Sequence, residues 1–309
     1  MTLAIHTRQL AKHYGKHPAL HGLDISVEEG TVFGVIGPNG AGKTTTMRLL
    51  LDIIRPSSGS AQVLGQDPRR AGSAIRRDIG FLPGELRLEG RVTGRQLLRH
   101  YAHISGPVAP GAIDALAERL GLDLGRQVRT LSKGNKQKLG LVQAFMHQPK
   151  LLVLDEPTSG LDPLVQQEFL AMIREARNNG QTVFLSSHVL SEIQQAADTV
   201  AILRAGRVIT VSDVNSLRLT AIRHVRLGVT GTTAQVVHDT VAAVPGVSEL
   251  TVTNGDDARV TATIEGDIDP FVKAASRFQV TDLVVQEPDL EESVLRLYNI
   301  APEESTDEQ

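Results

Sequence analysis

The sequence contains no cysteine and no tryptophan, and its aromatic residues amount to only 3%. The absence of cysteine excludes disulfides, zinc knuckles and thiol nucleophiles, and it favours a reducing cytoplasm as the location. The scarcity of aromatic rings argues against a surface on which nucleic-acid bases stack. The formal net charge is only −3, so nothing in the overall charge attracts nucleic acid or a membrane.

No apolar run approaches the roughly 20 residues needed to cross a bilayer, and residues 1–8 lack the basic-then-apolar pattern of a signal peptide. We therefore expect a cytoplasmic protein that reaches a membrane only through a partner. With 309 residues, 41% of them hydrophobic, the chain is typical of a soluble globular protein of two domains, although one large α/β domain is also compatible with this length.

The most specific pattern lies at residues 37–45, which match the phosphate-binding loop G-x-x-x-x-G-K-[ST]. Residues 31–36 before it predict a buried strand, and 45–51 after it predict a helix. In that context backbone N–H groups surround a polyphosphate at a helix N-terminus. Lys43 would reach the β- and γ-phosphates of ATP, and the Thr44 hydroxyl would bind Mg²⁺. A chance match is disfavoured by the flanking elements. The predicted loop residues are Gly37, Pro38, Asn39, Gly40, Ala41, Gly42, Lys43, Thr44 and Thr45.

Polar side chains follow two predicted core strands. Residues 151–156 form an apolar run that ends in Asp155 and Glu156, and residues 182–187 lead into His188. The carboxyl edge of a parallel sheet is where α/β folds bind ligands. Asp155 is suited to hold Mg²⁺ through water, Glu156 to accept a proton from the attacking water, and His188 to meet the γ-phosphate. The alternatives are acids that only cap the turn at Pro157 and a structural histidine.

Three weaker signals allow two interpretations each. Residues 131–135 precede the predicted helix 139–147 and could bind an anion, although Ser and Gly are also ordinary capping residues. Tyr14 could stack on a purine base or lie in a surface turn. Residues 69–99 carry eight arginines against three acidic residues, which could face an acidic partner or anionic lipid, or could be a solvated helix face.

Together these stretches resemble the ATP-binding subunit of an ABC transporter over residues 2–215. The resemblance implies an α/β fold of the P-loop NTPase class at 1–220, with a helical subdomain at about 86–145. The matching elements are the adenine-stacking aromatic (Tyr14), Walker A (37–45), the signature motif usually written LSGGQ (131–135), Walker B (151–156), the D-loop (159–163) and the switch histidine (His188).

The same resemblance implies a head-to-tail dimer that encloses a pair of ATP molecules. Each nucleotide would lie between the Walker A loop of one copy and the signature loop of the other. The residues expected to serve the opposite copy are Ser132, Lys133, Gly134, Asn135 and Asp162. An anion site supplied by the second copy would make dimer closure depend on the γ-phosphate. The family's further partner is a separate membrane permease, on whose cytoplasmic side the ATPase sits.

Two departures from the family pattern stand out. The signature carries Lys133 and Asn135 where Gly and Gln are usual, and Lys133 adds a cation without removing a backbone donor. In addition, Gly84 stands where the family's Q-loop glutamine, which contacts magnesium and relays nucleotide state, is expected. Glu85 or a water would have to replace it, so Gly84 is left out of the predicted metal ligands, which are Thr44 and Asp155.

The last hundred residues differ in pattern from the rest. They predict strands at 223–229, 247–253, 258–264 and 280–286, helices at 233–244, 269–277 and 290–298, and a turn at 254–255. This βαββαβ order predicts a small ferredoxin-like α+β accessory domain at 221–301. An acidic tail follows at 302–309. Residues 287–298 resemble the ending of ATPases that serve antibiotic and multidrug exporters of the daunorubicin-resistance type.

The leading hypothesis is therefore an ATPase subunit that drives export of a drug, antibiotic or lipid-like substrate through a separate permease. An importer ATPase whose C-terminal domain senses a ligand is the alternative, and the 287–298 ending favours export. A non-transport ABC protein acting on nucleic acid or the ribosome is disfavoured, because the chain has one cassette rather than two and no overall basic charge.

Overall fold

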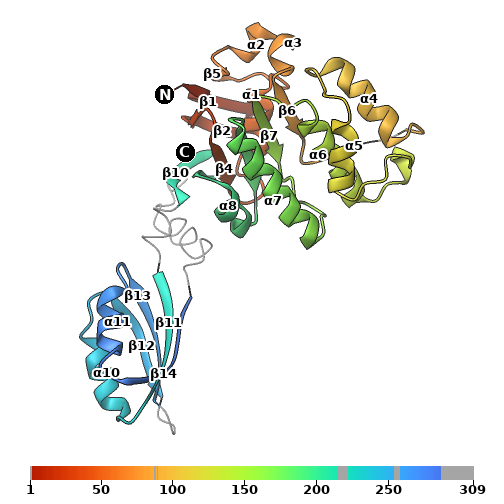
Figure 1. Cartoon of the computed structure of the whole chain (residues 1–309). Helices are drawn as coiled ribbons and strands as arrows, with labels where there is room; N and C mark the ends of the chain where they lie inside the picture. The colour runs from red at the N-terminus through yellow and green to blue at the C-terminus, as the bar shows by residue number, and fades with distance from the viewer. Residues whose placement is uncertain (1, 87, 89, 215–221, 254–257, 287–309) are drawn as a thin grey trace. The chain divides into compact units, whose positions relative to one another are not determined.

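The computed structural model describes residues 2–86, 88, 90–214, 222–253 and 258–286, which belong to two compact units, Met1–Ser212 and Asp213–Gln309 (Figure 1). Within these described residues, no helix combines the length and the apolarity that a membrane crossing requires. The predicted turn at 254–255, helix 290–298, exporter-like ending at 287–298 and tail at 302–309 lie outside the described residues.

A six-stranded sheet forms the centre of the first unit. Its strand order is β10-β9-β4-β8-β7-β6, and the pairs β9/β4, β4/β8, β8/β7 and β7/β6 are parallel. Parallel strands that are covered on both faces usually have continuous apolar sequences. In agreement with this, every residue of β4, β7 and β8 is buried. The strands are β4 (Val32–Ile36), β6 (Ile79–Leu82), β7 (Leu151–Asp155), β8 (Thr182–Ser187), β9 (Thr199–Arg204) and β10 (Arg207–Asp213).

A second, antiparallel sheet belongs to the same unit. Its long strand β1 (Leu3–Tyr14) pairs with β2 (His17–Leu23), β3 (Ser26–Glu28) and β5 (Ser58–Val63). Helix α1 (Lys43–Leu50) contacts both sheets, and Met47 and Leu50 share a core cluster with Phe33, Val35 and Phe184. On the other side of β4, a Cβ at Gly34 would lie 2.7 Å from Ile193 of α8 (Leu190–Ala196), so glycine allows that helix to pack closely.

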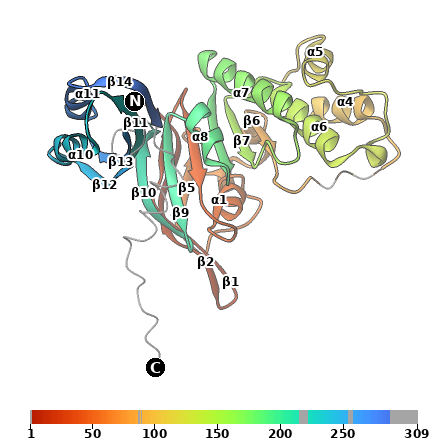
Figure 2. The ribbon, with the colours of Figure 1, turned by 90° about the horizontal axis from the view of Figure 1, so that it is seen from below.

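The helical part of this unit lies beside β6 and β7 (Figures 1 and 2). It contains α4 (Gly94–Ile104), α5 (Ala112–Arg119), a 3₁₀ turn (Val128–Thr130) and α6 (Lys133–Phe145). Thr93 and Gln96 form a reciprocal capping box at the start of α4, which fixes where that helix begins. The remaining helices are α2 (Pro68–Ala71), α3 (Ser73–Arg76) and α7 (Pro163–Asn178).

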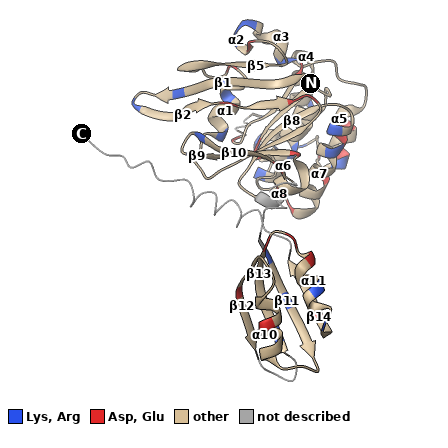
Figure 3. Cartoon of the chain, turned by 90° about the vertical axis from the view of Figure 1, so that its left-hand side faces the viewer, with Lys and Arg blue, Asp and Glu red and all other residues tan. Residues whose placement is uncertain are grey.

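Helices α5 and α7 of the first unit carry charges of both signs, whereas α1, α2, α3, α4 and α6 carry lysines and arginines only (Figure 3). Arg119 of α5 forms ion pairs with Glu168 and Glu175 of α7, which join the helical part to the sheet's covering helix. In the arginine-rich stretch 69–99, Arg76 lies 4.0 Å from Asp52 and Arg95 lies 2.6 Å from Asp114. These arginines therefore already have carboxylate partners within the chain.

The second unit is an antiparallel sheet of order β12-β13-β11-β14 with two helices on one face. Its elements are β11 (Ile222–Thr230), α10 (Ala234–Ala242), β12 (Val247–Thr253), β13 (Ala258–Glu265), α11 (Asp269–Ala275) and β14 (Gln279–Gln286). Phe271 and Val241 from the helices pack against Val225, Leu227 and Val229 of the central strand. The βαββαβ sequence of elements is thus observed, and the assignment to the ferredoxin-like class stays a prediction.

The Thr7 hydroxyl of β1 donates to the Leu23 carbonyl and accepts from the Ile25 N–H, which separates β2 from β3. Two details differ from the sequence-based expectations. The helix expected at 139–147 starts earlier, at Lys133, since Ser132 caps it. Strand β10 was not expected, because its half-exposed edge position leaves only a weak apolar pattern.

Candidate nucleotide site

The loop between β4 and α1 encloses a hollow of about 150 Å³, lined by Ala19, Asn39, Gly40, Ala41, Gly42, Lys43, Thr44, Thr45 and Glu156. Gly40 and Gly42 have φ angles of +84° and +108°, which favour glycine. A Cβ at Gly42 would also lie 2.6 Å from the Leu20 side chain. These glycines let the backbone turn tightly into α1, whose free N–H groups face an incoming anion.

Lys43 lies inside this loop with only 6% of its surface exposed. Its amine donates to the carbonyl oxygens of Gly37 at 2.6 Å and Pro38 at 3.3 Å, and lies 3.9 Å from a carboxylate oxygen of Glu156. Burial lowers the pKa of Lys43, and the nearby carboxylates of Glu156 and Asp155 oppose that shift. The amine is thus held at the rim of an anion-sized hollow.

Asp155 is buried at the end of β7, and both of its oxygens accept hydrogen bonds. Thr44 Oγ1 donates to Oδ2 at 2.7 Å, and Ser186 Oγ donates to Oδ1 at 2.5 Å. Oxygen donors of this kind suit Mg²⁺, which is usually held by one or two protein ligands together with phosphate oxygens and water. No cluster of three His, Cys, Asp or Glu side chains suited to a metal occurs among the described residues. Thr44 and Asp155 therefore fit a magnesium that shares its ligands with a nucleotide.

Glu156 has an unusual backbone conformation, with φ of +47° directly before Pro157. Such left-handed geometry costs roughly 1–3 kcal/mol and persists only where neighbours fix it. Its N–H donates to Ser186 Oγ at 3.1 Å, and its carbonyl accepts from Gln137 Nε2 at 3.2 Å. One carboxylate oxygen lies 3.2 Å from Nδ1 of His188. Walker B and the predicted switch histidine therefore meet in one place.

Gly84, where the family's Q-loop glutamine is expected, lies against the same acid. A Cβ at this position would be 3.1 Å from Asp155 Oδ2 and 3.3 Å from its Cγ. Even an alanine would therefore crowd the carboxylate. The absent glutamine is thus accompanied by a close approach of the backbone to Asp155, a feature that motif comparison alone does not reveal.

The signature and D-loop residues form a second group. Ser132 caps α6 by accepting from the Asn135 N–H at 3.3 Å, and Lys133 donates to Ser159 Oγ at 3.2 Å. A Cβ at Gly134 would lie 2.7 Å from the Gly160 carbonyl oxygen. Asp162 caps α7 through the Val165 N–H at 3.1 Å. Within the described part of the chain, no hydrogen bond or ion pair joins this group to the phosphate loop.

Tyr14 ends β1 with 46% of its side chain exposed, and the Lys12 amine lies 5.1 Å from its ring centroid. The ring is therefore available to a ligand.

Sequence reasoning missed two polar residues that support this site, Gln137 and Glu192. Gln137 is 3% exposed and bridges the carbonyls of Glu156 and Pro157 from helix α6. Glu192 accepts from Thr158 at 2.7 Å and from Ser187 at 2.8 Å, on either side of the strand ends. The sequence pattern offers no signal for Gln137, which stands between Lys136 and Lys138 in the polar first half of α6.

Comparison with known proteins matches this arrangement. The family model described as "ABC transporter" covers residues 20–159. The bacitracin transport ATP-binding protein BcrA of Bacillus licheniformis is 39% identical over 212 residues, which span 68% of this chain and 69% of that protein. This chain is an ABC transporter ATP-binding protein.

The daunorubicin resistance ATP-binding protein DrrA3 of Streptomyces coeruleorubidus is 41% identical over 212 residues, covering 67% of both chains. A solved ATP-binding subunit of an ABC transporter is 29% identical with a TM-score of 0.65, over 70% of this chain and 92% of the other. The expected fold class of the first unit is confirmed. As a member of the ABC ATPases, the cassette binds and hydrolyses ATP, and its relatives are of the drug-exporter type.

Proposed function

We propose that this ABC ATPase powers a separate membrane permease that exports a drug, an antibiotic or a lipid-like compound. Support comes from relatives named for bacitracin transport and daunorubicin resistance, which share about 40% of the aligned residues with this chain. The described residues contain no helix able to cross a membrane, so the transport path would belong to a partner. The ATPase would then work at the cytoplasmic face of the membrane, held there by the permease.

The observation that carries the catalytic part is the meeting of Lys43, Thr44, Asp155, Glu156 and His188 at one edge of the parallel sheet. Glu156 would accept the proton of the attacking water, with its carboxylate oriented by His188 and its backbone fixed by Gln137. Lys43 would stabilise charge on the transferred phosphoryl group. Thr44 and Asp155 would hold Mg²⁺, which when bound neutralises charge on the phosphates.

We further propose a head-to-tail dimer in which the second group of residues completes the site. Helix α6 is 13 residues long and its N-terminus is capped by Ser132. Lys133 adds a positive charge beside that N-terminus. Both features suit the γ-phosphate of a nucleotide held by another copy. Gly134 and Asn135 would approach that phosphate with their backbone, while Asp162 would contact the other copy near its own phosphate loop.

The variant Glu156→Gln tests this proposal, because it keeps the shape of the side chain and removes its basicity. We expect ATP turnover to fall by about 10³-fold while ATP still binds, so that an ATP-bound dimer accumulates in size-exclusion chromatography with light scattering. The matched control is Glu118→Gln, which changes an exposed carboxylate of α5. Undiminished hydrolysis in Glu156→Gln would remove this residue from the role of base, and the absence of any ATP-dependent dimer would contradict the shared site.

A further inference from the structure

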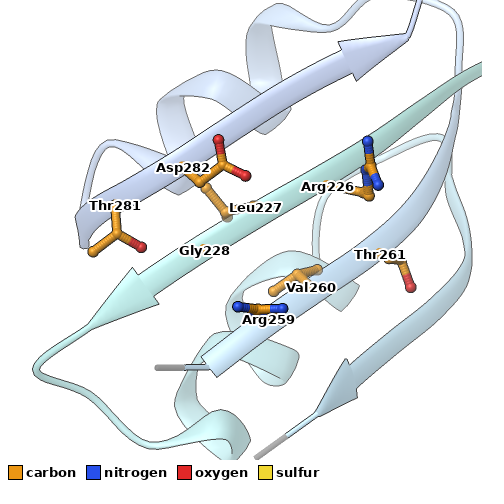
Figure 4. Close-up of a pocket in the computed structure, with 8 residues that line it drawn as sticks. All are labelled: Arg226, Leu227, Gly228, Arg259, Val260, Thr261, Thr281 and Asp282. Carbon is orange, nitrogen blue, oxygen red and sulfur yellow. The ribbon is translucent and has the colours of Figure 1, made fainter. Parts of the chain in front are cut away.

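One face of the sheet in the second unit is left uncovered by the residues of that unit that the structure describes. The apolar residues of β11 and β13 point to α10 and α11 on the covered face. Side chains alternate along a strand, so Arg226 and Gly228 of β11 and Arg259 and Thr261 of β13 lie on the opposite face. None of the described helices covers that face in this unit, and a hollow of about 310 Å³ opens on it (Figure 4).

The hollow exists because a glycine occupies the middle of the central strand. Gly228 pairs with Arg259 of β13 on one side and with Asp282 of β14 on the other. A glycine inside a strand weakens it and often marks a place where another group approaches the backbone closely. Because Gly228 has no side chain, the backbone of β11 forms the floor of the hollow between Arg259 and Asp282.

An irregularity in β14 turns a hydroxyl toward this floor. The register between β11 and β14 shifts after Gly228, so Thr281 is an extra residue between Asp282 and Val280. Such bulges re-aim side chains and are frequent near binding sites. A Cβ at Gly228 would lie 2.8 Å from Thr281 Oγ1, so the hydroxyl stands where a side chain at 228 would be. Glycine and bulge together make the hollow polar.

The charges in the hollow are unpaired. Neither guanidinium, of Arg226 or of Arg259, makes a hydrogen bond or ion pair with any described residue. Asp282 faces the hollow from β14 and likewise has no ion pair within the described residues. Arg259 and Asp282 stand on strands that flank β11, which places their backbones about 10 Å apart. That separation leaves room for a small molecule between them.

We propose that this face binds a small zwitterion, a molecule with a carboxylate or a phosphate at one end and an ammonium group at the other. The two guanidiniums would hold the anionic end, because their planar donors match both oxyanions. Asp282 would accept from the ammonium, and the Thr281 hydroxyl would bind whichever end reaches the floor. The site lies outside the ATPase cassette, so the proposal is independent of the proposed export function.

The test is a titration of the full-length, deuterated chain followed by the amide NMR signals of Gly228 and Thr281. Saturating ADP keeps the phosphate loop occupied, so that added anions do not compete there. The probes are O-phosphoethanolamine and β-alanine, which carry the phosphate and the carboxylate form of the same chemistry, and inorganic phosphate, which lacks the ammonium. We expect saturable shifts with at least one zwitterion, and the tighter of the two identifies the preferred anion. Inorganic phosphate should bind at least tenfold more weakly.

Two variants separate the ends of the ligand. Arg226→Gln with Arg259→Gln should weaken binding of the preferred zwitterion at least tenfold, whereas Arg277→Gln, an exposed arginine elsewhere on the same unit, should leave it within twofold. Asp282→Asn should weaken the zwitterion about tenfold and leave inorganic phosphate equal or tighter, because a repulsive carboxylate is removed. Unsaturable shifts for both zwitterions, or a titration that the double arginine variant does not change, would overturn the proposal.

Discussion

The two units treat polar side chains in opposite ways. In the first unit the polar groups gather at the ends of parallel strands and bind one another. Both oxygens of the buried Asp155 accept hydrogen bonds, and Glu156 is held through its N–H and its carbonyl. In the second unit Arg226 and Arg259 stand exposed along the middle of antiparallel strands, without described partners.

This difference explains why the nucleotide site of the first unit can be predicted from sequence motifs and the hollow of the second unit cannot. The carboxyl ends of parallel strands lie at the same edge of the sheet. Each group of site residues in the first unit therefore appears in the sequence as a contiguous motif directly after an apolar run. On an antiparallel face the residues of one site alternate with core residues and come from three strands. The hydrogen bonds among the residues of the first site also restrain their side chains, so a substitution there leaves a partner unsatisfied. Residues of the second site have no such described partners and can be substituted one at a time.

The largest expected effect tests whether the two units are independent in stability. Phe271 is fully buried in the core of the second unit, and Phe271→Ala should destabilise that unit by about 3–5 kcal/mol. Differential scanning calorimetry should show the transition of the second unit lost or lowered while the transition of the first is unchanged.

The matched variant is Phe184→Ala, which removes a fully buried ring stacked on Phe33 with centroids 5.7 Å apart in the first unit. It should lower only the other transition. A single transition that both variants shift equally would show that the units fold as one, and the comparison would lose its basis.

The next prediction separates the two sites by ligand. Lys43→Ala removes the only amine lining the phosphate-loop hollow among the described residues, and ATP affinity should fall by about 10²-fold in isothermal titration calorimetry. The zwitterion titration followed at Gly228 should not change. Lys150→Ala, which changes an exposed lysine just before β7 and outside that hollow, serves as the control. A Lys43→Ala chain that binds ATP within threefold of the natural one would contradict the assigned role.

Much of the first unit could be predicted from the sequence, because its signals are local. At the start of α4, for example, the capping pair Thr93 and Gln96 is a signal that can be found in the sequence alone. The phosphate loop, both acids and His188 stand out in the sequence because each lies at the end of a short, fully buried strand that is rich in apolar residues. Gly84 was noticed only as a departure, and its contact with Asp155 could not be predicted, since it depends on the pairing of β6 with β7.

Gln137 shows the limit most clearly. Its partners are backbone carbonyls 19 and 20 residues away, and backbone atoms leave no mark in a sequence pattern. The hollow on the second unit is equally hidden: a lone glycine in a strand and two arginines on alternating positions look like an ordinary solvated strand until the register places them together.

Gln137 therefore offers a sharper test of how pairing rigidifies the first site. Gln137→Ala removes the side-chain donor to the carbonyls of Glu156 and Pro157. The Glu156 carbonyl still accepts from the Ser159 N–H at 3.1 Å, but its left-handed backbone loses one of its restraints. We expect kcat for ATP hydrolysis to fall about tenfold with KM for ATP changed less than threefold, because the orientation of Glu156 matters to the reaction rather than to binding.

The control is Gln181→Ala, since Gln181 also donates its amide, to the Pro149 carbonyl at 2.6 Å, but lies at the opposite edge of the same sheet. A loss of stability shared by both variants, without a selective loss of kcat in Gln137→Ala, would reduce Gln137 to a packing residue.

The smallest expected effect concerns the one buried side-chain atom of the described residues that lacks a partner, His147 Nδ1. Its Nε2 donates to the Ile79 carbonyl at 3.3 Å, and burial lowers the pKa of His147 below the ordinary value of 6.5, while that hydrogen bond and Asp78 act in the other direction. The unfolded chain therefore takes up a proton first as pH falls. The contribution of His147 to the free energy of unfolding is therefore constant above about pH 7. Below the pKa of the unfolded histidine this contribution decreases as the pH falls, by at most about 1.4 kcal/mol per pH unit.

In urea titrations between pH 7.5 and 5.5, His147→Gln should reduce this slope, while His100→Gln, which changes an exposed histidine on α4, should keep it. An unchanged slope in His147→Gln would mean that the acid sensitivity of the first unit comes from its paired carboxylates instead.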